Sequence, residues 1–387
     1  MRSKTNSLQE KLKYRYLLNN PYYIRRDVKK LAKKGLRESF KAEKNKRQDT
    51  EDYPIDFVVT WVDGNDPKWM NEKAKYQPPK TNNKDDNSSA RYRDWDNLCY
   101  WFRAIEKNAP WVRYIFFITY GHLPEWLDTS NPKLKIIKHE DYIPKEYLPT
   151  YNSRVLELNL WRIQELSEHF VYFNDDIFLV NSVFKSDYFA DGFPAIYAVT
   201  KPNKPKLEMT SWDFARYNNC RACNSCFSIK KKIEQHPEKW FSYKYGKNIK
   251  YNIRSYEDGY ISGLVFPHIT FSFRKSRMEE CFCKLQKHFE LTFSHKFRSN
   301  EDLNLQVFDM WEMMHNTFEP TGNSGALINS SQFSYDMINS MLNDPSLKCV
   351  CINDGDGIKD EEFEYVKTMV NQLLQEKYSE KSSFELW

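Results

Sequence analysis

The stretch IDFVVTWV (Ile55–Val62), followed by DGND (Asp63–Asp66), indicates the fold of this chain. Its apolar, β-branched and aromatic residues predict a buried strand that stops in carboxylates. A second run, FVYF (Phe170–Phe173), stops in NDD (Asn174–Asp176). Ligands of open α/β sheets bind just beyond the carboxyl ends of strands. Two acidic strand ends therefore predict a site that shares one hard cation and, through it, a phosphate.

These acidic ends also have a purely structural interpretation. Asp-Gly and Asn-Asp are ordinary turn residues after a strand, and one such turn alone would indicate nothing more. Two of them, each closing an unusually apolar run, favour a site.

The rest of the chain supplies further strands and helices in alternation. Strands are expected at Tyr114–Thr119 and Lys135–Ile137, and helices over Leu98–Ile105 and Leu156–Leu166. Strand, helix, strand, helix, strand predicts an α/β fold with a Rossmann-like, mostly parallel sheet flanked by helices. A polar loop over Pro78–Ser89, an α-rich insertion at about 183–345 and a late amphipathic helix complete the expected body over residues 51–387.

Composition narrows the class of protein. The 387 residues are 40% hydrophobic and 16% aromatic, which is enough for a core, while the 11 glycines include no glycine-rich nucleotide-binding loop. The sequence shows neither a run long enough to span a membrane nor an apolar signal core, so we expect a cytoplasmic protein.

Charge is distributed unevenly along the chain. Residues 1–50 carry 16 Lys/Arg and 5 Asp/Glu, a net charge of +11, which leaves −6 for the rest because the total is +5. A basic helical arm of this kind lies on an anionic membrane surface, touches nucleic acid, or is a solvated tail. Interspersed apolar residues favour the surface-lying helix: Leu8, Leu12, Tyr16, Tyr22, Tyr23, Ile24 and Leu31. The acidic body argues against nucleic acid as a partner.

The eight cysteines leave two interpretations open. Cys220, Cys223 and Cys226 form C-x2-C-x2-C, with Cys281 or Cys283 as a fourth zinc ligand from elsewhere. The usual paired C-x2-C layout is absent, so reduced, partly buried thiols are the favoured interpretation.

Four ordered blocks of sequence resemble the Stealth family, which contains bacterial capsule sugar-1-phosphate transferases and the GlcNAc-1-phosphotransferase of lysosomal enzymes. They span nearly everything after residue 54. The chain departs from the family at Cys99, where an arginine is usual and Arg103 is the available substitute, and at Thr270, where His-x-Pro is usual. The blocks are Ile55–Asp66, Arg91–Asp176 with its pieces APWVR, LPTYNS and YFNDD, a third with His268 and His295–Asp302, and a fourth with Ile352–Asp354 and Ser382–Glu385.

The resemblance implies a GT-A-like fold and transfer of a sugar-1-phosphate from a UDP-sugar to a hydroxyl of a glycan or lipid-linked glycan, releasing UMP. It also implies Mg²⁺ or Mn²⁺ held by carboxylates. His268 is the expected general base, with His295 as its competitor, and Arg298 and Arg216 are the expected diphosphate contacts. The other implied site residues are Asp63, Asp66, Asp175 and Asp176 for metal and donor positioning, and Asn152, Glu157, Arg93 and Asp94 for contacts to the sugar, a metal-bound water or the polar loop.

Three alternatives remain open from sequence. A metal-dependent GT-A-like glycosyltransferase would attack the anomeric carbon and release UDP instead. A zinc-dependent nucleic-acid-binding module would use the arm and the cysteines. A catalytically dead scaffold would keep only the fold. If the chain transfers a sugar-1-phosphate, as the family resemblance implies, the arm would anchor a cytoplasmic enzyme peripherally at the inner face of the membrane. Each Lys/Arg near that surface would contribute about 1 kcal/mol to binding.

Overall fold

The computed structural model describes residues 25–45, 52–77, 93–329, 333–354 and 360–387. The chain divides into two compact units. The sheet unit consists of Asp52–Tyr188, Phe266–Asp302 and Ser324–Trp387. The helical unit consists of Met1–Glu51, Phe189–Val265 and Leu303–Asn323. Part of the expected insertion, residues 266–302 and 324–345, therefore belongs to the sheet unit, and the described part of the arm, residues 25–45, belongs to the helical unit.

The sheet unit is built on a five-stranded sheet in the order β3-β2-β1-β4-β8. The first four strands are parallel, and β8 pairs antiparallel with β4 at one edge. The strands are β1 (Ile55–Thr60), β2 (Ile115–Thr119), β3 (Leu134–Lys138), β4 (His169–Asn174) and β8 (Phe271–Arg274). Residues on both faces of β1 and β2 are buried, as a central parallel strand requires. The expected mostly parallel α/β sheet is confirmed.

Asp56, on β1, is fully buried inside this sheet. Its carboxylate accepts two hydrogen bonds from Arg113, at 2.7 and 2.5 Å, and one from the backbone N–H of Ser167 at 2.8 Å. A buried charge persists only when it is paired and hydrogen-bonded in this way. Asp56 thus holds the amino ends of β1, β2 and β4 together and is not part of an active site.

A second, three-stranded sheet in the order β10-β11-β5 continues the sheet unit. Its strands are β5 (Ile177–Leu179), β10 (Gly325–Asn329) and β11 (Cys349–Asn353). The turn Asp175–Asp176 connects β4 of the first sheet directly to β5 of the second. Because β11 runs antiparallel to β5, its carboxyl end lies beside that turn.

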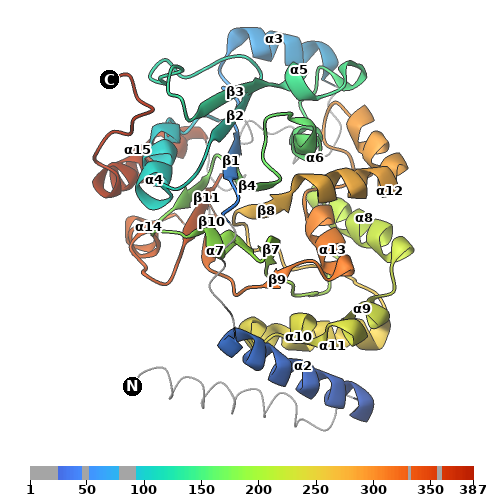
Figure 1. The fold of residues 1–387 in the computed structure, drawn as a ribbon. Coiled ribbons are helices and arrows are strands. Elements are labelled where there is room, and N and C mark those ends of the chain that lie inside the picture. Colours follow the sequence, from blue (N-terminus) through green and yellow to red (C-terminus); the bar gives the residue numbers. More distant parts are fainter. Residues whose placement is uncertain (1–24, 46–51, 78–92, 330–332, 355–359) are drawn as a thin grey trace. The chain divides into compact units, whose positions relative to one another are not determined.

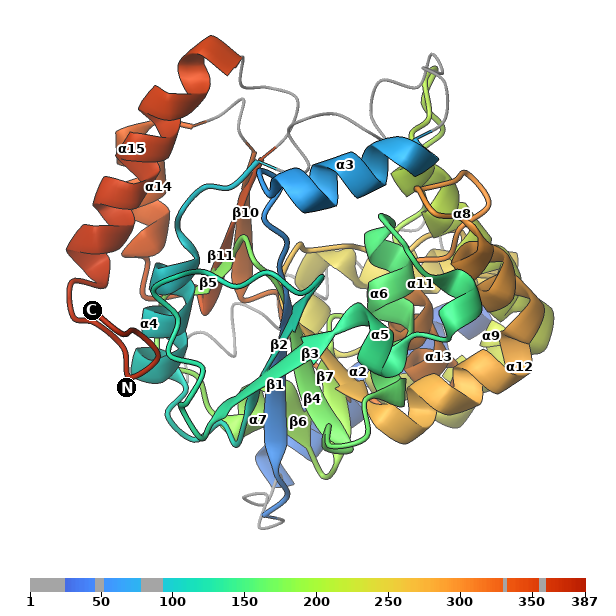
Figure 2. The same ribbon diagram turned by 90° about the horizontal axis from the view of Figure 1, so that it is seen from above.

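Helices cover the sheet unit on two sides. Figures 1 and 2 show α4, α14 and α15 on one side of the five-stranded sheet, and α5, α6 and α12 on the other. The helix α3 follows the carboxyl end of β1. The bounds are α3 (Pro67–Tyr76), α4 (Leu98–Asn108), α5 (His139–Tyr142), η2 (Lys145–Tyr147), α6 (Ser153–Leu158), η3 (Leu160–Arg162), α7 (Lys185–Tyr188), α12 (Lys275–Ser294), α14 (Tyr335–Leu342) and α15 (Asp360–Lys377).

The helical unit contains α2, packed on α10 and α11, and a small sheet in the order β6-β7-β9. Gly35 lets α2 approach closely, since a Cβ there would lie 2.2 Å from the backbone oxygen of Pro237. The bounds are α2 (Arg26–Asn45), β6 (Phe189–Ala190), β7 (Phe193–Ile196), α8 (Ser211–Cys226), α9 (Ile229–Gln235), α10 (Pro237–Trp240), η4 (Tyr243–Asn248), α11 (Ile249–Asp258), α13 (Gln306–His315) and β9 (Glu319–Pro320).

The helix and the polar loop that the sequence predicts have different outcomes. The single helix expected over Leu156–Leu166 is wrong, because α6 ends at Leu158 and only the short turn η3 follows it. The amide side chain of Asn159 bonds back to the oxygen of Val155, which competes with continuation of the helix. The polar loop expected at Pro78–Ser89 lies outside the described residues.

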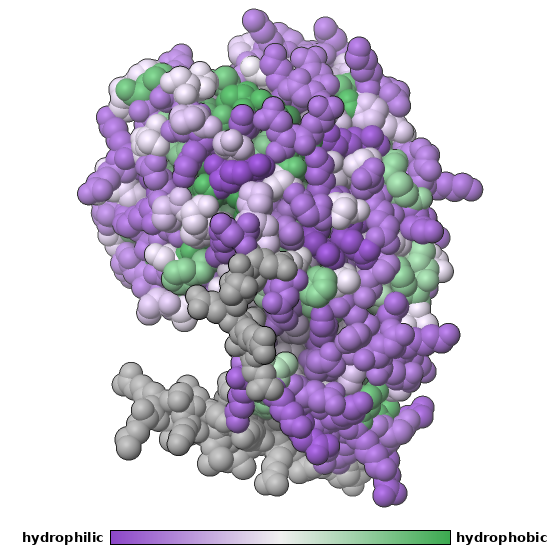
Figure 3. Space-filling view, in the orientation of Figure 1, coloured by the Kyte–Doolittle hydropathy of each residue, from purple (hydrophilic) through white to green (hydrophobic). Residues whose placement is uncertain are grey.

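The surface in view is mainly polar, with only scattered apolar side chains (Figure 3). In the parts of the chain that the structure describes, no helix is both long enough and apolar enough to cross a membrane.

Candidate active site at the ends of β1 and β4

A cavity of about 290 Å³ lies in the sheet unit at the carboxyl ends of β1 and β4. The pairing of Thr60 with Asn174 brings these two ends to the same edge. Its wall combines acidic, basic and aromatic side chains. It is lined by Thr60, Trp61, Val62, Trp69, Arg93, Asp94, Trp95, Asn97, Leu98, His139, Thr150, Tyr151, Ser153, Leu156, Glu157, Tyr172, Asn174, Asp175, Asp176, Arg298, Ile352, Asn353 and Asp354.

Besides Glu157 of α6, described below, three segments bring carboxylates to this cavity. Asp175 and Asp176 occupy the turn between β4 and β5, and Asp354 follows β11. Asp94 comes from the segment before α4. The Oδ2 of Asp354 accepts from Trp95 Nε1 at 3.2 Å and lies 3.8 Å from Arg93 Nη1. The predicted convergence of strand ends therefore gathers acidic residues from two sheets and one loop.

The cavity raises the pKa values of three of its aspartates and so disfavours their charged forms. Desolvation by the surrounding protein, followed by the neighbouring Asp176, raises the pKa of Asp175 to about 7, although the residue itself is exposed. Burial raises the pKa of Asp176 to about 6, and Asp354 adds to this effect. Burial also raises the pKa of Asp94. The cavity thus holds more carboxylates than it can easily keep charged, and a cation would favour their ionised forms.

The turn residues fit a hard divalent cation. The Oδ1 of Asp176 is buried and has no hydrogen-bond partner among the described residues, so it is an oxygen ligand still available. No group of three His, Cys, Asp or Glu side chains that could hold a metal occurs in the described ranges. Mg²⁺ commonly takes one or two carboxylates and completes its shell with water and substrate phosphates. Asp175 and Asp176 fit that mode of binding.

One face of α6 forms the opposite wall. Ser153, Leu156 and Glu157 follow the i, i+3, i+4 spacing of a helix face, and all three line the cavity. Burial raises the pKa of Glu157 to about 6, although the positive charge of Arg298 opposes the shift. Arg298 Nη2 donates to Ser153 Oγ at 2.8 Å. The cavity therefore holds an arginine and a carboxyl group that titrates near neutral pH.

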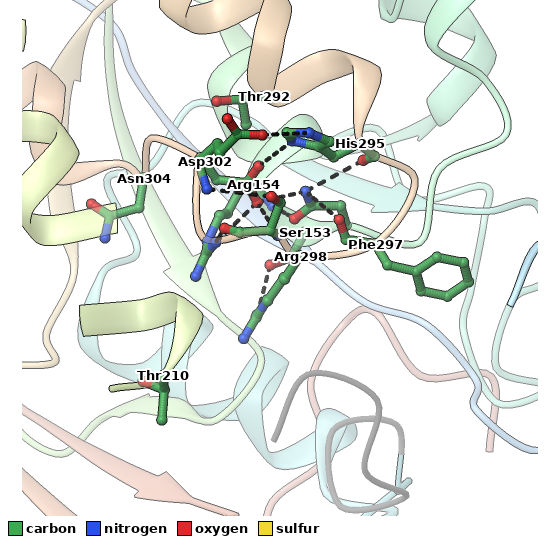
Figure 4. A network of polar contacts seen from close by, with 12 residues as sticks. Ser153, Arg154, Thr210, Thr292, His295, Phe297, Arg298, Asp302 and Asn304 are labelled. Atoms are coloured by element: carbon green, nitrogen blue, oxygen red, sulfur yellow. Dashed lines mark hydrogen bonds and ion pairs between the residues drawn. The ribbon is translucent and has the colours of Figure 1, made fainter. Parts of the chain in front are cut away.

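A buried network centred on Asp302 fixes Arg298 and α6 (Figure 4). The Oδ2 of Asp302 accepts hydrogen bonds from Arg154 Nη1 at 2.9 Å and Asn152 Nδ2 at 3.0 Å. Its Oδ1 lies 2.8 Å from His295 Nδ1. Because both Arg154 and Asp302 are buried, this ion pair depends on all of its hydrogen bonds. Asn152 also accepts from the N–H of Arg154 as the N-cap of α6. Asn152, an expected donor contact, thus positions α6 and does not line the cavity.

Asp63 and Asp66 lie beside the cavity but not in its lining. Asp66 is the N-cap of α3 and accepts from the N–H of Trp69 at 2.8 Å. Asp63 accepts from the N–H of Asn65 at 2.8 Å, and its own N–H donates to His122 Nε2. Both side chains therefore carry out turn and cap roles in the described structure.

The expected base His268 also lies outside the cavity lining. It is partly exposed, has a backbone φ of 48°, and packs edge-on against Phe266 with ring centroids 4.4 Å apart. Arg216 belongs to the helical unit, on α8, where its Nη2 donates to the backbone oxygen of Leu264 at 2.9 Å. Arg103, the substitute considered for the missing family arginine, forms a two-pronged ion pair with Glu385.

The three cysteines considered as zinc ligands lie on one helix, α8. Cys220 and Cys223 are buried, whereas Cys226 is exposed. Two buried thiols and one exposed thiol fit the interpretation of these residues as reduced, partly buried cysteines.

Several cavity residues were not among the expected site residues, including Asp354, His139 and Tyr172. Asp354 could have been found, because it follows the apolar run CVCIN just as Asp175 follows β4. His139 and Tyr172 carry no local sequence signal, since their role depends on which elements meet in space. Burial lowers the pKa of His139 to about 4, so its imidazole is neutral at physiological pH.

Comparison with known proteins agrees with the four blocks of sequence. Residues 53–78 match conserved region 1 of the Stealth proteins, and residues 91–205 match conserved region 2. The capsular polysaccharide phosphotransferase WcwK of Streptococcus pneumoniae is 42% identical over 339 residues, covering 86% of this chain and 98% of the relative. The exopolysaccharide phosphotransferase cps2G of Lactiplantibacillus plantarum is 33% identical over 335 residues, covering 86% and 96%.

Among solved structures, the galactosyltransferase LgtC, in complex with donor and acceptor sugar analogues, is 10% identical with a TM-score of 0.33 and covers 81% of this chain and 95% of its own. A similarity this low supports no conclusion about the site. The two matched regions and the similarity to these polysaccharide phosphotransferases show that the chain belongs to the Stealth family.

Proposed function

We propose that this chain transfers a sugar-1-phosphate from a UDP-sugar to a hydroxyl of an acceptor glycan during the synthesis of capsular or other cell-surface polysaccharide. The acceptor oxygen attacks the phosphorus that carries the sugar, the bond from that phosphorus to the bridging oxygen breaks, and UMP leaves with the bonding electrons. The observation that supports this most is the cavity in which the Asp175–Asp176 turn and Arg298 meet, in a chain 42% identical to a polysaccharide phosphotransferase.

Phosphoryl transfer needs positioning and neutralisation of charge on non-bridging oxygens. A divalent cation, Mg²⁺ or Mn²⁺, held by Asp175 and Asp176 would supply positive charge to the diphosphate of the donor. Arg298 supplies a second positive charge. One of its N–H groups is held by Ser153, and the guanidinium has further donors that suit a phosphate.

The acceptor hydroxyl must lose its proton as the new bond forms. Within the cavity, Glu157 suits this role because its pKa of about 6 keeps it ionised, yet basic enough, near neutral pH. The sequence resemblance alone supports His268 as the general base. Since it is outside the cavity lining, it takes part only if substrate binding brings its loop inward. The two candidates predict different effects of substitution, described below.

The main rival is a glycosyltransferase that uses the same donor and releases UDP after attack at carbon. The two reactions differ in the nucleotide that leaves, so the nucleotide product in the presence of acceptor decides between them. Acceptor-dependent UMP supports the proposal, and acceptor-dependent UDP contradicts it.

A cytoplasmic location with contact to the inner face of the membrane belongs to the same proposal, and α2 supports it. The larger apolar side chains of this helix are buried or half-buried in the helical unit, and Phe40 stacks on Tyr243 at 4.5 Å. Its exposed face is therefore basic rather than apolar, which suits adsorption to anionic lipid headgroups and not insertion. The exposed basic residues are Arg26, Lys30, Lys33, Lys34, Arg37, Lys41 and Lys44.

A further inference from the structure

An aromatic surface continues from the cavity wall to the outside of the sheet unit. Tyr151 lines the cavity and is close to three other aromatic rings. The centroid of its ring lies 5.8 Å from that of Trp69 on α3, 5.4 Å from that of Phe297, on which it stacks, and 6.2 Å from that of Tyr76 at the end of α3. Figure 4 shows the Phe297 ring pointing away from the polar network around Asp302. The four rings thus come from three separate segments and form one connected group, which we call the aromatic surface.

Resting on the function proposed above, we propose that the aromatic surface binds the sugar rings of the acceptor glycan as they leave the cavity. Flat aromatic faces suit the apolar C–H faces of pyranose rings, and a polar edge or neighbour then bonds the hydroxyls. Trp69 and Tyr151 supply the part that lines the cavity, and Phe297 and Tyr76 supply the part beyond it.

The size of the cavity favours binding of the acceptor on a surface outside it. Its volume of about 290 Å³ is at the small end of pockets for small molecules, which start at about 300 Å³. A nucleotide sugar fills such a space, so a glycan of several residues has to extend outside it. The aromatic surface is continuous with the cavity wall through Tyr151, which makes it suited to receive the second and later sugars.

Two lysines supply polar contacts along this path. The Nζ of Lys73 lies 5.1 Å from the Trp69 ring centre, and the Nζ of Lys296 lies 5.1 Å from the Tyr76 ring centre. Lys296 also donates to the backbone oxygens of Leu148 and Pro149, which fixes it in place. Ammonium groups held over these rings are donors for the hydroxyl oxygens of a sugar bound next to them.

A purely structural role explains only half of the aromatic surface. Trp69 and Tyr151 are 3% and 7% exposed, so their packing also holds α3 against the sheet unit. Tyr76, however, is 42% exposed. A ring needed only for packing would be covered. Single exposed aromatic residues are ordinary, but this one extends a connected series that begins inside the cavity.

The test uses the full chain, Mg²⁺, a UDP-sugar donor and, as acceptor, the glycan extract of the cells that make the protein. The readout is acceptor-dependent release of UMP at varied acceptor and varied donor concentrations. Tyr76→Ala and Phe297→Ala should each raise the half-saturating acceptor concentration by about three- to tenfold, the range expected for one lost aromatic contact. The half-saturating donor concentration should change by less than about twofold, because neither ring lines the cavity.

Three controls separate the possible outcomes. Tyr76→Phe keeps the ring and should restore acceptor use. Tyr365→Ala removes another exposed tyrosine, 76% exposed on α15, and should behave as the unchanged protein. Thermal midpoints within about two degrees of each other show that the variants fold. Transfer by the unchanged protein with normal acceptor saturation in Tyr76→Ala and Phe297→Ala would overturn the acceptor surface alone. Absence of transfer by the unchanged protein would overturn the proposed function, and the acceptor surface with it.

Discussion

The backbone N–H of Ile352 donates a hydrogen bond to the backbone oxygen of Asp176 at 2.9 Å. This bond aligns the end of β11 with the turn between β4 and β5. It explains why Asp354, 178 positions further along the chain, lies in the same cavity as Asp176. The pairing of β5 with β11 therefore brings Asp176 and Asp354 together, whereas Asp94 and Glu157 reach the cavity from outside the two sheets.

Replacing Asp176 with asparagine should separate activity from stability. We expect Asp176→Asn to lose at least about a hundredfold in transfer rate, because it removes a charged ligand for the cation. The thermal midpoint without metal should not fall. The raised pKa of Asp176 means that its ionised form is unfavourable in the folded protein near pH 7, and asparagine removes that charge.

Thermal shift with Mn²⁺ and UDP checks the cation in the same proteins. The unchanged protein should gain stability on addition of both, and Asp176→Asn should gain much less. The matched control is Asp336→Asn, which neutralises an exposed carboxylate in the first turn of α14. Equal stabilisation of all three proteins would remove Asp176 from the cation site.

The pH dependence of transfer should identify the proton acceptor. A base must be deprotonated, so with Glu157 in this role kcat/KM rises with pH through about 6, the pKa to which burial raises this group. Glu157→Gln should abolish that rise and most of the activity, whereas His268→Asn should keep both. The reverse pattern, with the rise lost in His268→Asn, would assign the proton acceptor to His268 and leave Glu157 with a positioning role.

The Asp302 network should govern the stability of the sheet unit. Asp302→Asn should lower the free energy of unfolding by about 3–5 kcal/mol, since it leaves the buried guanidinium of Arg154 without its carboxylate. Urea denaturation of both proteins measures this. A loss below about 1 kcal/mol would mean that Arg154 finds another partner.

The same network should make stability depend on pH through His295. The hydrogen bond that His295 Nδ1 donates to Asp302 raises the pKa of His295, so the charged form of His295 stabilises the folded state fully below the usual histidine pKa of about 6.5. This contribution is lost as the pH rises through the raised pKa. His295→Gln should therefore flatten the fall in stability across that range, and an unchanged pH profile in the variant would exclude His295 as its source.

Binding to anionic vesicles tests the basic face of α2. Replacing four exposed cations with glutamine should reduce co-sedimentation with phosphatidylserine-containing vesicles by about tenfold or more, since each contributes about 1 kcal/mol near the surface. A protein with four exposed lysines of the sheet unit replaced should still bind. The test set is Lys30, Lys33, Lys34 and Arg37, and the control set is Lys145, Lys284, Lys287 and Lys381.

Equal binding by both vesicle variants would show that α2 does not direct membrane contact. The replaced residues of α2 all face solvent, and the packing residues Val28, Ala32 and Leu36 stay in place, so the helix should remain folded in the variant.

The sheet and its acidic end were predictable because they depend on strong local signals. Fully apolar runs such as IFFIT predict central parallel strands, and parallel strands share one carboxyl edge. That reasoning correctly brought the ends of β1 and β4 together. It could not separate Asp175 from Asp66, since carboxylates that cap helices and carboxylates that bind ligands have the same sequence pattern after a strand.

Other features depend on tertiary contacts that a local pattern does not contain. The apolar spacing of Leu156–Leu166 is that of a helix, but Asn159 ends the helix through its own side chain. Of the apolar residues that favoured a surface-lying arm, Leu8, Leu12, Tyr16, Tyr22, Tyr23 and Ile24 lie outside the described residues. Leu31, on α2, is half-buried in the helical unit. Asn152 and Arg298 both fall within family blocks, but only the structure distinguishes the first as part of the Asp302 network and the second as part of the cavity wall.

The central claim is attack at phosphorus, and the nucleotide product tests it most directly. The full chain would be incubated with Mg²⁺, a panel of UDP-sugars and glycan acceptors, and the nucleotides would be separated by chromatography. The proposed function predicts UMP that appears only with acceptor present and disappears in Asp176→Asn. Acceptor-dependent UDP in place of UMP would show attack at the anomeric carbon and contradict it.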